Sequence, residues 1–274
     1  MSEIEGAVLE DAPRAPDRPG GWHAVRDLAV DEAFRMVRHP ASLVGAALFL
    51  GLPWVEGAAD GTGQLAYSEL GEGLTMYYGV AAYFAAHRCA SRARRAGAGE
   101  WLEPLPMTPA RQTGAFCLAC LGPFAAACLG LAVAYTLVEQ VDLVVLEPGL
   151  WRLLGSAVTV LAGCLLGVMV SRWLPVAGAP LLVMTGLVAT CVLLQEVPLV
   201  LSPYTDWVGW PNTVLAEPYV TQGSPGWHVA YLVGLGGMAA AGSFVVHPPV
   251  RHWALLGGLA ALAVTVAAGL LQLP

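Results

Sequence analysis

The chain has 274 residues, of which 57% are apolar and only 12% are charged, and its mean hydropathy is +0.63. A soluble domain carries about 25% charged residues, so this composition argues against an ordinary soluble protein and predicts a lipid bilayer as the solvent. All 13 basic residues are arginine, and the net charge is −7. In a membrane protein the distribution of these charges is more informative than their sum.

The chain begins with an acidic, proline-rich stretch followed by an amphipathic one. Residues 1–21 contain no apolar signal region, so they are predicted to be a disordered cytoplasmic tail. Residues 22–39 have a helical period, with one apolar face formed by Trp22, Val25, Ala29, Ala33 and Met36. This segment is too charged to span a membrane. We expect a helix that lies on the inner membrane surface, the alternative being an ordinary soluble helix.

Seven later stretches have the length and apolar character of membrane spans, which need about 20 residues each. The sequence therefore predicts an all-α polytopic membrane protein with six to seven transmembrane helices. The core of six spans is expected over residues 41–246, and a probable seventh follows. The expected spans cover residues 41–57, 73–90, 113–137, 153–171, 177–198, 227–246 and 252–273.

The arginines predict the orientation of these spans, because basic residues concentrate on the cytoplasmic side. With the N-terminus inside, residues 1–40, the loop 88–112 and the turns at Arg172 and Arg251 contain all the arginines except Arg152. The external segments would be 58–72, 138–150 and 199–226. This distribution favours a multi-pass protein of a bacterial inner membrane with a cytoplasmic N-terminus.

Residues that would carry catalysis or bind metal are scarce in this sequence. No HExxH, GxSxG or P-loop motif occurs, and no His/Cys cluster has the spacing of a metal site. The six cysteines lie in or beside apolar runs, so we expect no disulfide framework. Glu196 is one of the few charged residues in a predicted span. It is either part of a transport pathway or an interfacial carboxylate satisfied by water.

The cytoplasmic loop 88–112 divides into two parts. Arg88 to Arg95 is explained by topology alone. Residues 97–106, GAGEWLEPLP, form a short acidic and aromatic stretch that starts at glycines and stops at prolines, which predicts a short helix. A helix of this kind beneath the membrane would fit a groove in another protein.

At these residues the sequence resembles the permeases of type-2 ATP-binding-cassette exporters, the ABC-2 membrane family. An amphipathic helix ends in VRHPASLVGAALFL before the first span, and the loop RAGAGEWLEPLPMTPARQ is similar to the family's coupling stretch. A long external segment also precedes the sixth span. The likeness covers residues 22–246, and the seventh predicted span departs from the six-span family core.

The resemblance implies a permease without its own ATPase activity. Its partners would be a cytosolic ATPase subunit, which binds ATP and Mg²⁺, and a second permease copy or a related half. The chain itself would bind no cofactor, metal or nucleic acid. Carried over by position, the coupling stretch would be Glu100, Trp101, Leu102, Leu105, Pro106 and Arg111, and the interfacial helix would contribute Arg35, Arg38 and Pro40.

The expected function is outward transport of an apolar or amphiphilic substrate, driven by ATP hydrolysis in the partner. The alternative is a non-transporting membrane scaffold or an immunity-type protein, in which the arginines only fix topology. A membrane-embedded enzyme would need a catalytic pair within the membrane, and the sequence contains none. Glycines in the fourth and sixth predicted spans, including Gly163, Gly167, Gly234 and Gly237, allow close helix approach either within the chain or between copies.

Overall fold

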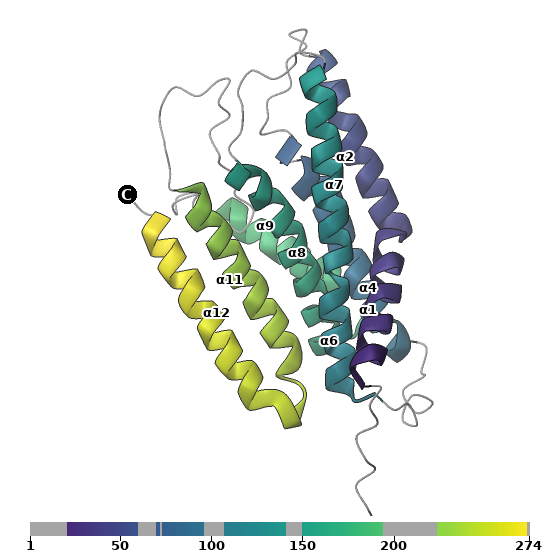
Figure 1. The fold of residues 1–274 in the computed structure, drawn as a ribbon, viewed down its shortest axis with the longest axis vertical. Helices are drawn as coiled ribbons and strands as arrows, with labels where there is room; N and C mark the ends of the chain where they lie inside the picture. The colour runs from purple at the N-terminus through teal and green to yellow at the C-terminus, as the bar shows by residue number, and fades with distance from the viewer. Residues whose placement is uncertain are drawn as a thin grey trace, which may run out of the picture.

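The computed structural model describes residues 21–59, 70–71, 73–95, 107–140, 150–193 and 224–272, and no strand occurs among them. The prediction of an all-α protein is confirmed for this part of the chain. Figure 1 shows the helices as one elongated bundle, and a helix lies over each of the seven predicted spans. The elements are α1 (Gly21–Val37), α2 (Pro40–Ala59), the π-helix η1 (Leu74–Gly79), α4 (Val80–Arg95), α6 (Pro109–Ala119), α7 (Leu121–Gln140), α8 (Leu150–Trp173), α9 (Ala179–Leu193), α11 (Pro225–Phe244), the 3₁₀ turn η3 (Pro248–Val250) and α12 (Arg251–Gln272).

Three helical stretches in the described residues are long and apolar enough to cross a membrane. They are Pro109–Leu137, which joins α6 and α7, Leu153–Trp173 in α8, and Pro248–Leu271, which includes α12. Pro40–Leu52 and Ala179–Ala189 are also apolar but shorter. The total of six to seven crossings stays a prediction. The predicted N-terminal tail and most of the predicted external segment 199–226 lie outside the described residues.

Helix α8 is the centre of the bundle, packed between α4 on one side and α11 on the other. Alanines make this close packing possible, since α4 buries Ala82, Ala85, Ala86 and Ala90. At Gly167 of α8 the backbone approaches α4 so closely that a Cβ would lie 2.6 Å from the carbonyl oxygen of Tyr83. Only glycine fits at this crossing without moving one of the two helices.

The other glycines singled out from the sequence also face helices of the same chain. Gly163 lies one turn from Gly167 and faces the carbonyl of Gly79 at 4.0 Å. On α11, Gly234 faces Thr265 and Gly237 faces Ala261, both on α12. These contacts favour packing within the chain over packing between copies at these positions.

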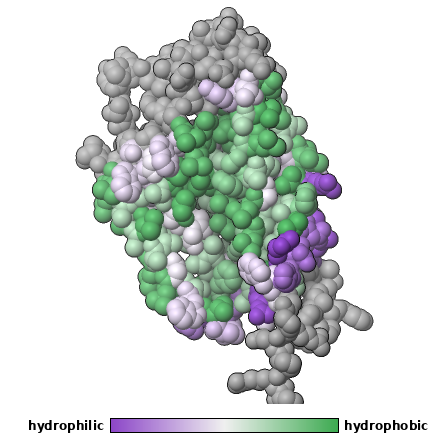
Figure 2. Space-filling view, in the orientation of Figure 1, coloured by the Kyte–Doolittle hydropathy of each residue, from purple (hydrophilic) through white to green (hydrophobic). Residues whose placement is uncertain are grey.

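The outer surface of the bundle is largely apolar, as the membrane prediction requires. Figure 2 shows apolar residues over most of the visible side, with hydrophilic residues gathered low on one edge, over α1. Helix α12 packs against α11 and exposes large apolar side chains, which are Trp253, Leu255, Leu256, Leu259, Leu262, Val264, Val266, Leu270 and Leu271. In water such a surface would be unfavourable, whereas in lipid it is the ordinary exterior.

The cysteines that the structure describes with their side chains are free, as the sequence predicts. Cys117 and Cys120, which form a CxxC pattern in α6 and the turn after it, bond instead to Ser243 and to the carbonyl of Phe116. Their role in the fold is packing between helices. Within the described residues no group of His, Cys, Asp and Glu could hold a metal ion.

Candidate functional site

Helix α1 runs along the charged end of the bundle and packs against α4, α6 and α7. Its apolar face buries Val25, Ala29 and Met36, so part of the predicted amphipathic pattern is satisfied by protein. The helical period places Trp22 on the same face, but this side chain is 68% exposed. The start of this face is therefore not covered by the described residues.

A buried carboxylate joins α1 to the arginine-rich end of α4. Glu32 is 1% exposed, and its Oε1 accepts hydrogen bonds from Arg35 and from Arg92, both at 2.9 Å. Arg35 also pairs with Asp31 at 2.7 Å. A buried charge is tolerated only when it is paired, and here the second partner comes from a helix far away in sequence. The sequence alone does not predict this contact, because Glu32 is one of several charged residues on the polar side of the predicted amphipathic helix.

Helix α4 continues through the arginines that the sequence places in a loop. Arg88, Arg92 and Arg95 are spaced by four and then three residues, so they project from one face of this helix. The difference from the predicted end at residue 90 has a simple cause, because ARR is a good helix-forming run once its charges have partners. Arg95 donates to the carbonyl of Arg88, seven residues earlier in the same helix, at 2.7 Å.

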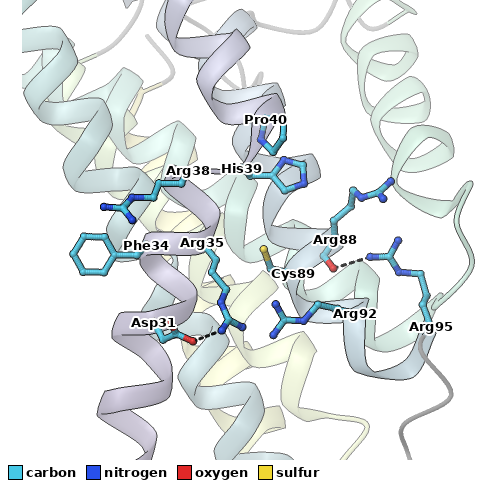
Figure 3. Close-up of a pocket in the computed structure, with 10 residues that line it drawn as sticks. All are labelled: Asp31, Phe34, Arg35, Arg38, His39, Pro40, Arg88, Cys89, Arg92 and Arg95. Carbon is cyan, nitrogen blue, oxygen red and sulfur yellow. Dashed lines mark hydrogen bonds and ion pairs between the residues drawn. The ribbon is translucent and has the colours of Figure 1, made fainter.

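These arginines and α1 together line an open pocket of about 510 Å³. Figure 3 shows Arg35 and Arg92 reaching toward each other between the helices, with Arg88 and Arg95 close together on the α4 side. Arg38, predicted as a residue of the interfacial helix, lies over the ring of Phe34 at 5.5 Å. The lining residues are Asp31, Phe34, Arg35, Arg38, His39, Pro40, Arg88, Cys89, Arg92 and Arg95.

The corner between α1 and α2 forms one wall of this pocket and is held by its own hydrogen bonds. His39 Nδ1 accepts from the backbone N–H of Ala41 at 3.2 Å, and Ser42 Oγ donates to the carbonyl of Met36 at 2.7 Å. Burial, together with the nearby charge of Arg88, lowers the pKa of His39 below its usual 6.5. A neutral imidazole is the form that can accept the Ala41 hydrogen bond. The lowered pKa of His39 favours this same form.

The predicted coupling stretch is only partly within the described residues. Glu100, Trp101, Leu102, Leu105 and Pro106 lie outside them. Arg111 is described, in the first turn of α6, where its backbone N–H is capped by Thr108 Oγ1 at 3.3 Å. Its guanidinium lies against the start of α1, where a Cβ on Gly21 would be 2.7 Å from one of its nitrogens.

The residue that follows the predicted coupling segment 97–106 also contacts α1. Met107 packs with Val25 and Ala29 of α1 and with Ala115 of α6. The described chain therefore stops at the end of α4, which Arg92 holds to Glu32, and resumes at Met107 beside α1. The described residues on both sides of the predicted coupling stretch therefore pack against the predicted interfacial helix.

A second polar cluster lies where α6, α8 and α11 meet. Thr113 Oγ1 is 2.9 Å from His247 Nε2, and Trp173 Nε1 donates to the carbonyl of Gly242 at 2.9 Å. Arg94 donates to the carbonyl of Arg172 at 3.1 Å, which ties α4 to the end of α8. Burial, with the charges of Arg172 and Arg94, lowers the pKa of His247 below its usual 6.5.

An apolar cavity of about 220 Å³ lies between α8, α9 and α11. It is lined by Thr159, Ala162, Gly163, Leu166, Leu187, Tyr231, Leu232, Leu235 and Ala239. No side chain in this lining carries a charge. Glu196, the pathway candidate from the sequence, lies outside the described residues.

Comparison of the chain with protein-family models, with curated proteins and with solved structures finds no match.

Proposed function

We propose that this chain is the membrane-spanning permease subunit of an ATP-driven exporter, with six to seven crossings and a cytoplasmic N-terminus. A separate cytosolic ATPase subunit would dock at the end of the bundle formed by α1, the last turns of α4 and the first turn of α6. The chain itself would contribute no hydrolytic residue, and it would work with a second permease copy or a related half.

The observation that carries this proposal is the packing of both flanks of segment 97–106 against α1. Arg92 before the segment is bonded to Glu32, and Met107 after it packs on Val25 and Ala29. A partner that displaces the segment would therefore pull on α1 and on α4 and α6 at once. Since α4 packs directly on α8, the displacement would reach the centre of the bundle.

The apolar cavity between α8, α9 and α11 supports the proposed class of substrate. Its lining of aliphatic residues with Tyr231 and Thr159 suits an apolar or amphiphilic molecule and offers nothing to pair with an ion. A cavity of about 220 Å³ is below the usual range of drug-sized sites, roughly 300–1,000 Å³. We infer that it holds part of such a molecule, or widens when the helices move.

The docking proposal is tested by purifying the tagged full-length chain from its native membranes in a mild detergent. We expect an ATPase subunit with a P-loop motif to co-purify and to hydrolyse ATP in the preparation. Glu100→Arg, or deletion of residues 97–106, should release this subunit. Glu69→Arg makes the same charge change on the predicted external side and is the matched control.

Two outcomes would count against the proposal in different ways. If the ATPase remains bound to both the Glu100→Arg and the deletion variants, segment 97–106 is not the docking element. If no ATPase co-purifies with the unaltered chain, the alternative of a non-transporting membrane scaffold is favoured.

A further inference from the structure

The arginine pocket between α1 and α4 carries more positive charge than the helices themselves neutralise. Five guanidinium groups line it, from Arg35, Arg38, Arg88, Arg92 and Arg95. The carboxylates available to them among the described residues are Asp31 and Glu32, and these are bonded to Arg35 and Arg92. Within the part of the chain that the structure describes, the pocket therefore has more guanidinium groups than carboxylates to pair with them.

Two guanidinium groups on the α4 side, those of Arg88 and Arg95, have no acidic partner among the described residues, whereas Arg92 of the same helix is paired with Glu32. Among the described residues, Arg95 donates to one backbone carbonyl, that of Arg88. The guanidinium of Arg88 forms no ion pair or hydrogen bond with any residue that the structure describes. Figure 3 shows these two side chains next to each other at the same wall of the pocket. Like charges brought together in this way repel, unless an anion lies between them.

The chemistry of guanidinium groups indicates which anion would fit. A planar guanidinium donates parallel hydrogen bonds and binds phosphate oxygens two at a time, which makes arginine the preferred residue for phosphate recognition. Several such groups around a pocket of about 510 Å³ leave space for a phosphate with a substituent attached. A pocket of this volume is larger than one salt bridge between two side chains would require.

The surroundings of the pocket indicate what the phosphate is attached to. Phe34 forms part of the lining and is 57% exposed, and one turn beyond Pro40 the side chains of Leu43 and Val44 are 55% and 59% exposed. The cationic wall therefore continues into the apolar surface of α2. Figure 2 shows hydrophilic residues low on the edge where α1 lies, next to apolar residues. A ligand that has phosphate oxygens at one end and hydrocarbon at the other matches both surfaces.

We propose that this pocket binds the phosphate headgroup of an anionic glycerophospholipid, whose acyl chains lie along the start of α2. The inference rests on the membrane placement and cytoplasmic orientation given under the proposed function. Basic residues at the cytoplasmic face attract the anionic lipids of that leaflet. Here the fixed walls of α1 and α4 convert this general attraction into a defined site. The bound lipid would hold α1 against α4.

The proposal is tested on the purified full-length chain in detergent, without any ATPase. The probes are phosphatidylglycerol, phosphatidylcholine and inorganic phosphate, each titrated while the unfolding temperature and the lipid count by native mass spectrometry are followed. Phosphatidylglycerol should raise the unfolding temperature in a saturable manner, and the other two probes should not. Exchange of Arg88→Gln together with Arg95→Gln should weaken the apparent affinity by at least about tenfold.

The matched control removes the same number of charges from the same end of the bundle. Arg26→Gln with Arg251→Gln changes two exposed arginines outside the pocket and should leave the response intact. If the double variant does not purify as a folded protein, Arg88→Gln alone serves, because that guanidinium supports no contact in the described structure.

Three results would overturn the proposal. One is an equal loss of response in the pocket variant and the control, which would mean diffuse charge attraction. The second is saturation by inorganic phosphate alone, which would make the ligand a free anion. The third is the absence of any response to phosphatidylglycerol. Because no ATPase is present, none of these results bears on the docking of the partner subunit.

Discussion

Glu32 of α1 and Arg92 of α4 form an ion pair at 2.9 Å between residues 60 positions apart in the chain. Arg35, on the same helix as Glu32, bonds to the same carboxylate oxygen, and Oε2 has no partner among the described residues. The arginine side chains are about half exposed, while the carboxylate is 1% exposed. The two exposed guanidiniums are thus fixed by one buried anion.

This arrangement predicts that Glu32→Gln loosens α1 from α4. A hydrogen bond to a charged group is worth about 1.5–3 kcal/mol, and the exposed arginines can recover part of this from water. We expect a loss of about 2 kcal/mol in the free energy of unfolding in detergent. Asp31→Asn is the matched control, since that carboxylate pairs with the same Arg35 but is 56% exposed. Its removal should cost less than about 1 kcal/mol, and equal losses in the two variants would contradict the assigned role of Glu32.

The crossing of α4 and α8 predicts different outcomes for two glycines one turn apart. A Cβ at Gly167 would lie 2.6 Å from the carbonyl oxygen of Tyr83, so Gly167→Ala should force the helices apart at a cost of about 1–3 kcal/mol. At Gly163 the nearest atom in another element is 4.0 Å away, and Gly163→Ala should be neutral or stabilising by up to about 1 kcal/mol. The free energy of unfolding of the two variants, measured in the same detergent, tests this prediction. An unchanged stability of the Gly167→Ala variant would contradict the close approach of the two helices.

The environment of His247 predicts a loss of stability at mildly acidic pH. Burial and the neighbouring Arg172 and Arg94 lower the pKa of His247 in the folded protein, while the unfolded chain takes up its proton near 6.5. The unfolded state therefore binds more protons as the pH falls below 6.5, so stability decreases there until the folded histidine is also protonated. The unfolding temperature measured between pH 7.5 and 5 should show this slope.

His247→Gln should reduce the acid slope without abolishing it, because His39 has a pKa lowered in the same direction. The control is His252→Gln, which replaces an exposed histidine five residues away. An acid slope that persists unchanged in the His247→Gln variant would mean that another group is responsible.

The seven predicted spans place the two ends of α12 on opposite sides of the membrane. Alkaline phosphatase needs disulfides and is active only where they can form, outside the cytoplasm. Fusion of this enzyme after residue 272 should therefore be active in a bacterial host, and fusion after residue 247, which lacks only η3 and α12, should be inactive. Activity in the shorter fusion would mean that the predicted membrane orientation is reversed. Inactivity in both fusions would mean that both ends of α12 lie on the cytoplasmic side and that α12 does not cross the membrane.

The positions of the helices could be predicted from hydropathy because lipid-facing and buried helical surfaces are both apolar. The limits of α4 could not. The predicted span ended at residue 90, since hydropathy measures the cost of leaving water and not the tendency to remain helical. The spacing of Arg88, Arg92 and Arg95 already contained the information that a continued helix would align them. The convergence of these residues with Arg35 and Arg38 depends on how α1 crosses α4, for which the sequence holds no local signal.

Glu32 and Trp22 show that helical periodicity alone does not predict which side chains are buried. Glu32 is buried because a distant arginine neutralises it, whereas periodicity would place a carboxylate in solvent. Trp22 fits the apolar face by periodicity, yet the described protein does not cover it. In the proposed placement this indole would face the lipid headgroups, where tryptophan is favoured. The residues of the coupling stretch from Glu100 to Pro106 stay a prediction, which the purification experiment addresses.

The pocket between α1 and α4 contains only guanidinium groups as its cations, in a chain without lysine. A guanidinium keeps its proton at every pH at which proteins remain folded, and it offers no amine for acetylation. Burial and the charge of Arg88 lower the pKa of His39, the histidine in this lining, which favours its neutral form. The positive charge of this site is therefore a constant of the molecule. A cell could alter what binds there only by changing the supply of the anion or the position of α1.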